Sequence, residues 1–319
     1  MIKGETAGNL LVVGGSYFLG KTFLSMVLDK RYAWERIFVV NRGSRPLPEC
    51  AQSDPRATLV RADRRDAEAL SPLAGVHFNA VVDFCGYNAG DIRFLTEQLS
   101  GGIGRYVFVS TVDALARGTG RELDEAAPLE DREFPGETGA YISGKVALER
   151  ELVSLHEETG LPFTIVRPAI IYGSGNYAPR EGMYFHWIRG AKDGKPQIIH
   201  PADATGHFQM VYADDVARFL AEYALRGEAE NEVFHLCGTK TYTYDSYAEL
   251  LEHATGLVIE RVPMPVADLI ARGIPLPFPY YAEESETYAD TKSIKLGFRY
   301  TSDILGMQES YQDSSLRSE

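Results

Sequence analysis

Six short apolar segments, separated by stretches with helical spacing, limit what this chain can fold into. The segments are continuous and rich in β-branched residues, and they span 10–13, 37–40, 58–60, 80–84, 106–109 and 163–166. Helical spacing occurs between several of them, for example over 21–30, 91–99 and 141–159. Apolar strands that alternate with helices are typical of a parallel sheet covered on both faces. The sequence therefore predicts a Rossmann-like, doubly wound α/β fold.

The character of the sequence changes after Pro168. Residues 173–201 are rich in Gly, Pro and aromatic side chains, which is typical of a loop-rich cap. Further on, helices are predicted over 214–224 and 247–255, and a strand over 233–236. We expect a Rossmann domain over residues 1–170, to which 209–237 returns. The remainder, 171–208 and 238–319, is expected to form a smaller substrate-binding lobe.

Composition excludes several classes of protein. A net charge of −13 argues against a general nucleic-acid binder, because neutralising phosphates requires clustered Lys and Arg. The chain has three cysteines, Cys50, Cys85 and Cys237, and their number and spacing predict no disulfide framework. Neither these cysteines nor the seven histidines have metal-ligand spacing, so no metal site is predicted. No apolar run is long enough to span a membrane, and residues 1–9 lack the apolar core of a signal peptide. We therefore expect a cytoplasmic protein that makes no membrane contact.

The loop from Gly14 to Gly20 joins the first apolar segment to the first helix, where a dinucleotide-binding loop belongs. Small residues there let the backbone approach a pyrophosphate, and the helix that follows offers free N–H groups and a partial positive charge. The usual pattern has three glycines, and here Tyr17 takes the middle position. The sequence predicts contacts with NAD or NADP from Gly14, Gly15, Tyr17, Phe18, Leu19 and Gly20. The alternative is a tight strand-to-helix turn that binds no ligand.

The end of the second strand bears on the choice of cofactor. An acidic residue there would bind the ribose hydroxyls of NAD and repel the 2′-phosphate of NADP. The chain has Asn41 and Arg42 instead. Asn41 can hydrogen-bond a ribose hydroxyl and Arg42 can pair with a 2′-phosphate, which slightly favours NADP without excluding NAD; a solvated surface charge explains Arg42 nearly as well. Asp63, after the third strand, is expected either to meet the adenine edge or to cap the next helix.

Tyr141 and Lys145 lie four residues apart at the start of a predicted helix, and so share one of its faces. A tyrosine is a poor base at neutral pH unless a nearby positive charge favours the phenolate. A neighbouring ammonium therefore makes Tyr141 a candidate general acid/base. Upstream, the strand over 106–109 ends in Ser110 and Thr111, and strand ends of this kind face the ligand crevice. Thr111 is expected to hydrogen-bond the reacting oxygen, with Ser110 as the rival.

Taken together, these segments resemble the short-chain dehydrogenase/reductase superfamily, in its extended or atypical branch, the NAD-dependent epimerase/dehydratase family. The resemblance covers nearly the whole chain: the loop 14–20, Ser110-Thr111, Tyr141/Lys145, 166–168 with 171–173, 211–217, and 290–292 with 296–298. It implies that Tyr141 is the acid/base, that Lys145 holds the nicotinamide ribose and that Thr111 orients the reacting oxygen. The implied chemistry is hydride transfer at a carbinol carbon, for which the cofactor carries the hydride.

The resemblance and the predicted fold add further candidates. Cofactor contacts are expected from Phe84, Cys85, Gly86, Pro168 and Ile171. Substrate contacts are expected from Asp113, Tyr172, Tyr177, Arg180, His186 and His207.

Two departures from the family pattern bear on the substrate. Family dehydratases carry an acidic pair after the catalytic Thr, whereas this chain has Val112 before Asp113. Dehydration by the family mechanism is therefore disfavoured. Enzymes that act on nucleotide sugars usually place an Arg in the stretch that corresponds to 206–210, and none is present here. A nucleotide-sugar substrate is thus expected from the family alone.

The leading expectation is an NAD(P)-dependent oxidoreductase or epimerase that acts on a hydroxyl or keto carbon of a small molecule. The alternatives are an NADP(H)-dependent reductase of a non-sugar substrate, a dinucleotide sensor without turnover, and an RNA-binding protein, because some atypical relatives associate with RNA. The helices over 91–99 and 141–159 are the expected faces of a homodimer, and could equally be covered by the lobe.

Overall fold

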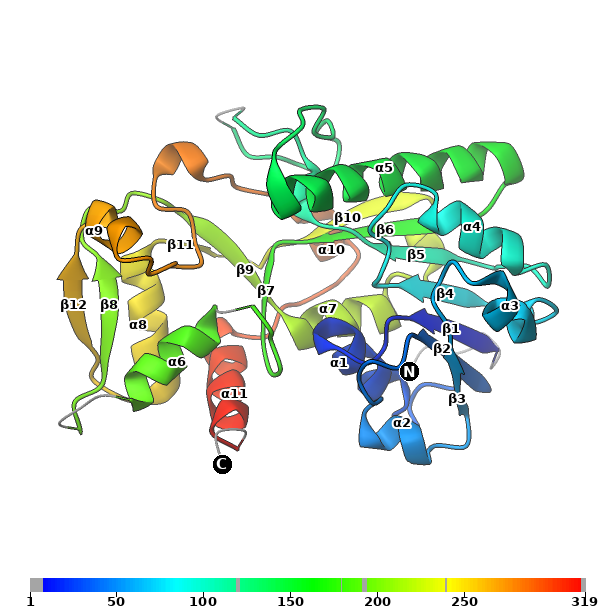
Figure 1. Ribbon diagram of the computed structural model, residues 1–319, viewed down its shortest axis with the longest axis horizontal. Coiled ribbons are helices and arrows are strands. Elements are labelled where there is room, and N and C mark those ends of the chain that lie inside the picture. The colour runs from blue at the N-terminus through cyan, green and yellow to red at the C-terminus, as the bar shows by residue number, and fades with distance from the viewer. Residues whose placement is uncertain (1–7, 119–120, 179, 191–193, 239, 317–319) are drawn as a thin grey trace.

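The computed structural model describes residues 8–118, 121–178, 180–190, 194–238 and 240–316, and it confirms the doubly wound fold. Seven parallel strands form the main sheet, in the order β10-β6-β5-β4-β1-β2-β3 (Figure 1). Their bounds are β1 (Asn9–Val13), β2 (Arg36–Asn41), β3 (Ala57–Arg61), β4 (Ala80–Asp83), β5 (Tyr106–Val109), β6 (Phe163–Pro168) and β10 (Glu232–Leu236).

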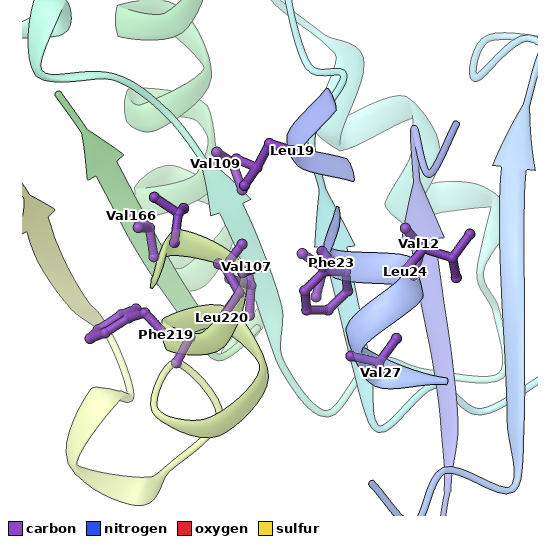
Figure 2. Packing of buried hydrophobic residues seen from close by; sticks show 14 of the residues in the cluster. Val12, Leu19, Phe23, Leu24, Val27, Val107, Val109, Val166, Phe219 and Leu220 are labelled. Carbon is purple, nitrogen blue, oxygen red and sulfur yellow. The ribbon is translucent and has the colours of Figure 1, made fainter. Parts of the chain in front are cut away.

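Helices cover both faces of this sheet, and the alternation of side chains along β1 shows how. Leu10 and Val12 point to the face covered by α1 (Phe18–Val27) and α7 (Ala213–Glu222), where Figure 2 shows the packing. Leu11 and Val13 point to the opposite face, which is covered by α3 (Ala67–Leu70), α4 (Asp91–Gln98) and α5 (Gly136–Thr159). A strand buried on both faces has to be apolar at every position, which explains the continuous apolar runs of the sequence.

A smaller lobe lies beside the carboxyl ends of these strands (Figure 1). It holds a three-stranded sheet, β11-β9-β7, and the parallel pair β12-β8. The strands are β7 (Ile170–Tyr172), β8 (Gln197–Pro201), β9 (Phe208–Tyr212), β11 (Thr241–Tyr242) and β12 (Glu260–Met264). Helices α6 (Glu181–Arg189), α8 (Tyr244–Thr255), α9 (Val266–Ala271) and α11 (Asp303–Leu316) pack around them. Aromatic rings fill this second core, and those of Phe208 and Phe278 stack at 3.6 Å between centroids.

Short elements complete the chain. They are α2 (Glu49–Ser53), α10 (Thr291–Lys295) and the 3-10 turns η1 (Ser71–Leu73), η2 (Val112–Ala114), η4 (Gly227–Ala229) and η5 (Ala282–Glu284). None of the helices among the described residues has both the length and the apolarity that crossing a membrane requires.

Three elements differ from the sequence prediction. Residues 173–201, expected to be loop-rich, contain α6 and β8. Helix α5 begins at Gly136, after Pro135, so Tyr141 lies in its second turn instead of opening the helix. Within 209–237, α7 and β10 join the Rossmann domain, whereas β9 pairs with β7 and β11 outside the main sheet.

Candidate active site

A cavity of about 870 Å³ opens at the carboxyl ends of the main strands, between the sheet and the lobe. Gly14 follows β1, Phe84 follows β4 and Ser110 follows β5, and all three line it. Pro168 at the end of β6 lines it as well. The carboxyl ends of parallel strands are where open α/β sheets bind ligands, so the fold itself places this cavity.

The glycine-rich loop at one end of the cavity is shaped for an anion. Gly14 has a φ of +94°, and a Cβ there would lie 2.1 Å from Sγ of Cys85. A Cβ on Gly20 would lie 2.0 Å from the carbonyl oxygen of Gly14. Helix α1 begins without a side-chain cap at Tyr17 and has no acidic residue in its first turn. Its free N–H groups therefore remain available, and the loop fits the pyrophosphate of a dinucleotide.

Three side chains form a stack over this loop. The ring of Tyr17 lies 4.8 Å from that of Tyr177, which comes from the loop after β7. The guanidinium of Arg45 lies 4.0 Å from the centre of the Tyr17 ring. Tyr17 and Tyr177 both line the cavity. A bulky residue at the middle position of the loop thus contacts the lobe.

The residues expected near the adenosine lie away from the cavity lining. Asn41 is buried and its Oδ1 accepts a hydrogen bond of 2.6 Å from the N–H of Gly43. Arg42 is exposed and does not line the cavity. Asp63 neither lines the cavity nor caps α3, because it accepts a hydrogen bond from the N–H of Arg65 while Asp66 caps that helix. The structure therefore adds no support for NADP over NAD.

Thr111 and Tyr141 meet inside the cavity. Desolvation raises the pKa of Tyr141 to about 12; the charge of Asp113 adds to the rise, and a hydrogen bond with Thr111 opposes it. The hydroxyl of Thr111 also accepts a hydrogen bond of 3.1 Å from the N–H of Asp113. Asp113 forms an ion pair with Arg117. Tyr141 is thus a protonated phenol at neutral pH that can donate a hydrogen bond inside the cavity.

Lys145 lies one turn further along α5 and is almost completely buried. Its Nζ donates a hydrogen bond of 2.8 Å to the carbonyl oxygen of Val109 and lies 5.8 Å from the centre of the Tyr141 ring. Burial lowers the pKa of Lys145 to about 8, which leaves the ammonium mostly charged at neutral pH. A positive charge at this place favours the phenolate that Tyr141 would form on giving up its proton.

Ser110, the rival of Thr111, is held in a buried network. Its hydroxyl donates a hydrogen bond of 2.5 Å to Glu149, and Glu149 pairs with Arg167 on β6. Ser110 borders the cavity, but its hydroxyl already donates its hydrogen bond to Glu149. Thr111 is therefore the better candidate for orienting a reacting oxygen.

The cavity brings together most of the residues predicted from the sequence. Its lining includes Gly14, Tyr17, Phe18, Leu19, Gly20, Phe84, Cys85, Ser110, Thr111, Asp113, Tyr141, Lys145, Pro168, Ile171, Tyr177, Arg180 and His207.

Four other predicted residues do not line the cavity. Gly15 and Gly86 are buried beside it. Tyr172, predicted to contact substrate, is buried in the core of the lobe, where its ring stacks on Tyr212 at 5.4 Å. His186, also predicted to contact substrate, is exposed on α6. The helical spacing of α6 places Tyr184 and Ile188 toward the core, and that turns His186 outward.

The sequence missed one side of the cavity. Arg117, Glu137, Glu284, Glu286 and Tyr288 line it and come from segments that are far apart in the chain. The N–H of Leu123 donates to the carbonyl of Thr287, which brings the loop after η2 against the C-terminal segment. These residues belong to no motif, and Glu137 lies on α5 while Glu284 lies on η5, so only the folded chain identifies them as neighbours. Among the described residues, no group of three or more His, Cys, Asp or Glu is placed to hold a metal ion.

Comparisons with known proteins agree with the fold. A model of the NAD dependent epimerase/dehydratase family matches residues 89–237. The chain is 24% identical over 265 residues to the chloroplast stem-loop binding protein of 41 kDa b of Arabidopsis thaliana, covering 80% of this chain and 65% of that protein. It is 26% identical over 270 residues to 2′-dehydrokanamycin reductase of Streptomyces kanamyceticus, covering 82% and 70%. The chain thus spans just under two thirds of the Arabidopsis relative.

Solved structures share the whole architecture. UDP-glucose 4-epimerase of Thermotoga maritima superposes with a TM-score of 0.75 at 21% identity, covering 98% of this chain and all of that one. The dTDP-glucose 4,6-dehydratase DesIV of Streptomyces venezuelae, solved with NAD bound, gives 0.71 at 21% identity, with 97% of both chains covered. The chain is thus similar to the NAD dependent epimerase/dehydratase family over residues 89–237, and the solved structures show that it shares their fold along nearly its whole length.

Proposed function

We propose that this protein is an NAD(P)-dependent oxidoreductase or epimerase that acts on a hydroxyl or keto carbon of a small molecule. The observation that carries the proposal is that Thr111, Tyr141 and Lys145 share one cavity with the glycine-rich loop. A scaffold that only bound dinucleotide would not need a buried ammonium beside a tyrosine. Burying a charge is costly and is usually retained for a function.

The residues of the chain divide the work between binding and proton transfer. The loop from Gly14 to Gly20 holds the pyrophosphate through backbone N–H groups. When bound, the nicotinamide cofactor supplies the acceptor or donor of the hydride. Tyr141 gives a proton to the substrate oxygen in reduction and takes it in oxidation, while Lys145 stabilises the phenolate. Thr111 fixes the orientation of that oxygen.

Both cofactors are compatible with the described residues. The family binds NAD(P), and no acidic side chain stands at the end of β2 to repel a 2′-phosphate. Arg42 is exposed at that end and does not line the cavity. We retain NADP as a proposal that rests on Arg42 alone.

The test begins with titration of the purified protein with NADH and with NADPH, followed by cofactor fluorescence. We expect sub-millimolar binding of at least one of them. Tyr141→Phe keeps the ring and removes the hydroxyl, so it is expected to retain cofactor binding and to lose turnover by about 100-fold or more. A dinucleotide sensor would keep its function in this variant. Failure of both cofactors to bind in the sub-millimolar range would overturn the proposal.

RNA binding, suggested by the name of the Arabidopsis relative, is not favoured for this chain. Its formal net charge is −13, and RNA phosphates attract a basic surface. The same preparation tests this alternative directly. An affinity for stem-loop RNA that falls steeply between low and physiological salt would support RNA binding; an absence of binding at low salt would leave the enzyme proposal standing alone.

A further inference from the structure

The charges on the lobe side of the cavity are unevenly distributed. Four carboxylates line the cavity: Asp113, Glu137, Glu284 and Glu286. Its lining also holds three cations, Arg117, Arg180 and Lys145, of which Lys145 is buried at the catalytic end. Asp113 lies beside Thr111 and pairs with Arg117, so the rest of this lining, among the described residues, holds Glu137, Glu284 and Glu286 against the single cation Arg180.

The carboxylates of the lining come from separate segments of the chain. Glu137 is exposed in the first turn of α5, and no ion pair with a described residue occupies it. Glu286 is half-buried and accepts a hydrogen bond of 2.6 Å from the N–H of Gly118. Glu284 accepts one of 3.1 Å from the N–H of Tyr280. A backbone N–H carries no net charge, so the hydrogen bonds of Glu286 and Glu284 do not neutralise these carboxylates as an ion pair would.

The arginines are already engaged. Arg117 forms an ion pair with Asp113 four residues earlier. Arg180 donates a hydrogen bond of 2.9 Å to the carbonyl oxygen of Ile171, and its charge faces the buried carboxylate of Glu181. Burial raises the pKa of Glu181 and the charge of Arg180 opposes that rise, so the two groups interact. Arg117 would have to break its contact with Asp113 to clamp a diphosphate, and Arg180 already donates to one backbone carbonyl.

Aromatic rings line the same region. Tyr288 lies among the charged groups: burial raises its pKa, the charges of Asp113 and Glu286 add to the rise, and that of Arg117 opposes it. Phe208 borders the cavity on the lobe side, although one face of its ring is covered by Phe278. Carboxylates together with the faces of aromatic rings are the usual environment of a bound ammonium group. The rings also pack against the apolar faces of a sugar or cyclitol.

We infer that this cavity selects a hydroxy or keto compound that carries amino groups, such as an aminosugar or aminocyclitol, over one that carries a diphosphate. The inference rests on the proposed function, because the same cavity must also hold the cofactor. It assigns Glu137 and Glu286 as specificity-determining residues that contact substrate ammonium groups. It also accounts for the lack of an arginine in 206–210, since no diphosphate has to be held there.

The experiment measures binding to the cofactor-loaded protein by calorimetry, with three probes. They are neamine, which carries four amines; its fully N-acetylated form, which has the same rings without the charges; and UDP-glucose. We expect neamine to bind at least tenfold more tightly than either of the others in low salt. Its affinity should fall as the salt concentration rises, because exposed carboxylates are screened.

Variants assign the effect to residues. Glu286→Gln keeps the oxygen that accepts from Gly118 and removes only the charge. Combined with Glu137→Gln, it is expected to weaken neamine binding about five- to tenfold, as for the loss of two partly exposed ion pairs. Glu157→Gln, on the exposed end of α5 outside the cavity lining, is the matched control and should change nothing.

Three outcomes would overturn the inference: UDP-glucose binding more tightly than neamine, neamine affinity unchanged in the double variant, or no binding of any probe at millimolar concentration. The titration with NADH and NADPH tests the proposed function and is interpreted separately from the binding of the three probes. Failure of NADH and NADPH to bind would count against the proposed function, while a preference for neamine over its acetylated form would still be measurable on the same protein.

Discussion

The guanidinium of Arg167 donates to the carboxylate of Glu149 across 2.6 Å, and both side chains are almost entirely buried. Glu149 lies one turn after Lys145 on α5, and it also accepts from Ser110 at the end of β5. The pair thereby fixes the catalytic helix to β5 and β6. The positions of Tyr141 and Lys145 relative to Thr111 depend on this buried contact.

Replacing Glu149 with Ala should be strongly destabilising. It leaves the charge of Arg167 buried without its partner, which typically costs about 3–5 kcal/mol. Urea denaturation measures the loss. The double variant Glu149→Met with Arg167→Met removes both charges and is expected to be more stable than the single variant. A single variant within about 1 kcal/mol of the unmodified protein would show that water reaches Arg167.

Lys145→Met is expected to separate stability from cofactor binding. The buried ammonium costs free energy, and burial lowers the pKa of Lys145 to about 8, so the unfolded state binds more protons between that pH and about 10.4. Stability should therefore rise with pH across that window in the unmodified protein and stay flat in the variant. NADH affinity should fall about 10- to 100-fold with the loss of a charged hydrogen bond. Unchanged NADH affinity would remove Lys145 from the cofactor site.

His235 should make the fold sensitive to acid. It is fully buried on β10, with Nδ1 3.0 Å from the carbonyl oxygen of Ala289. Burial lowers its pKa to about 3, and the charge of Arg167 adds to the effect. Between pH 6.5 and 3 the unfolded state holds a proton that the folded state lacks, so stability falls as pH falls, by up to about 1.4 kcal/mol per pH unit.

His235→Gln removes that titration and keeps an amide N–H for Ala289. Urea denaturation at several pH values from 7 to 4.5 should show a shallower loss of stability in the variant than in the unmodified protein. Equal slopes would mean that His235 is protonated in the folded state.

The main sheet could be predicted from the sequence because its central strands β1, β4 and β5 are buried on both faces. Leu10 to Val13 must be apolar throughout, and that run is visible without any structure. That Tyr141 and Lys145 share one helix and one cavity could also be predicted, because they lie four residues apart. The side chains of the lobe could not be placed from the sequence in this way. Tyr172 and His186 were expected to contact substrate, but Tyr172 packs in an aromatic core and His186 faces solvent.

The carboxylates that line the cavity could not be predicted from the sequence, for a different reason. Glu137 lies in the first turn of α5 and Glu286 in the C-terminal segment, and neither belongs to a motif that would place the two in one cavity. The role of Asn41 could not be predicted from the sequence for a related reason. Its residue type suited a ribose hydroxyl, yet its side chain closes a local turn on Gly43. Side chains such as Asn bond their own backbone as readily as a ligand, and sequence alone does not separate the two.

Tyr177→Ala should loosen the hold on the cofactor. The ring of Tyr177 stacks on Tyr17 in the phosphate loop at 4.8 Å, with the planes 23° apart, and so joins the lobe to the Rossmann domain over the cavity. An aromatic pair is worth about 0.5–1.5 kcal/mol, so the dissociation rate of NADH should rise about 2- to 12-fold, as measured by stopped-flow displacement. Tyr177→Phe retains the stack and should release the cofactor at the unmodified rate. If both variants release it equally fast, the phenolic hydroxyl and not the stacked ring is the group that holds the loop closed.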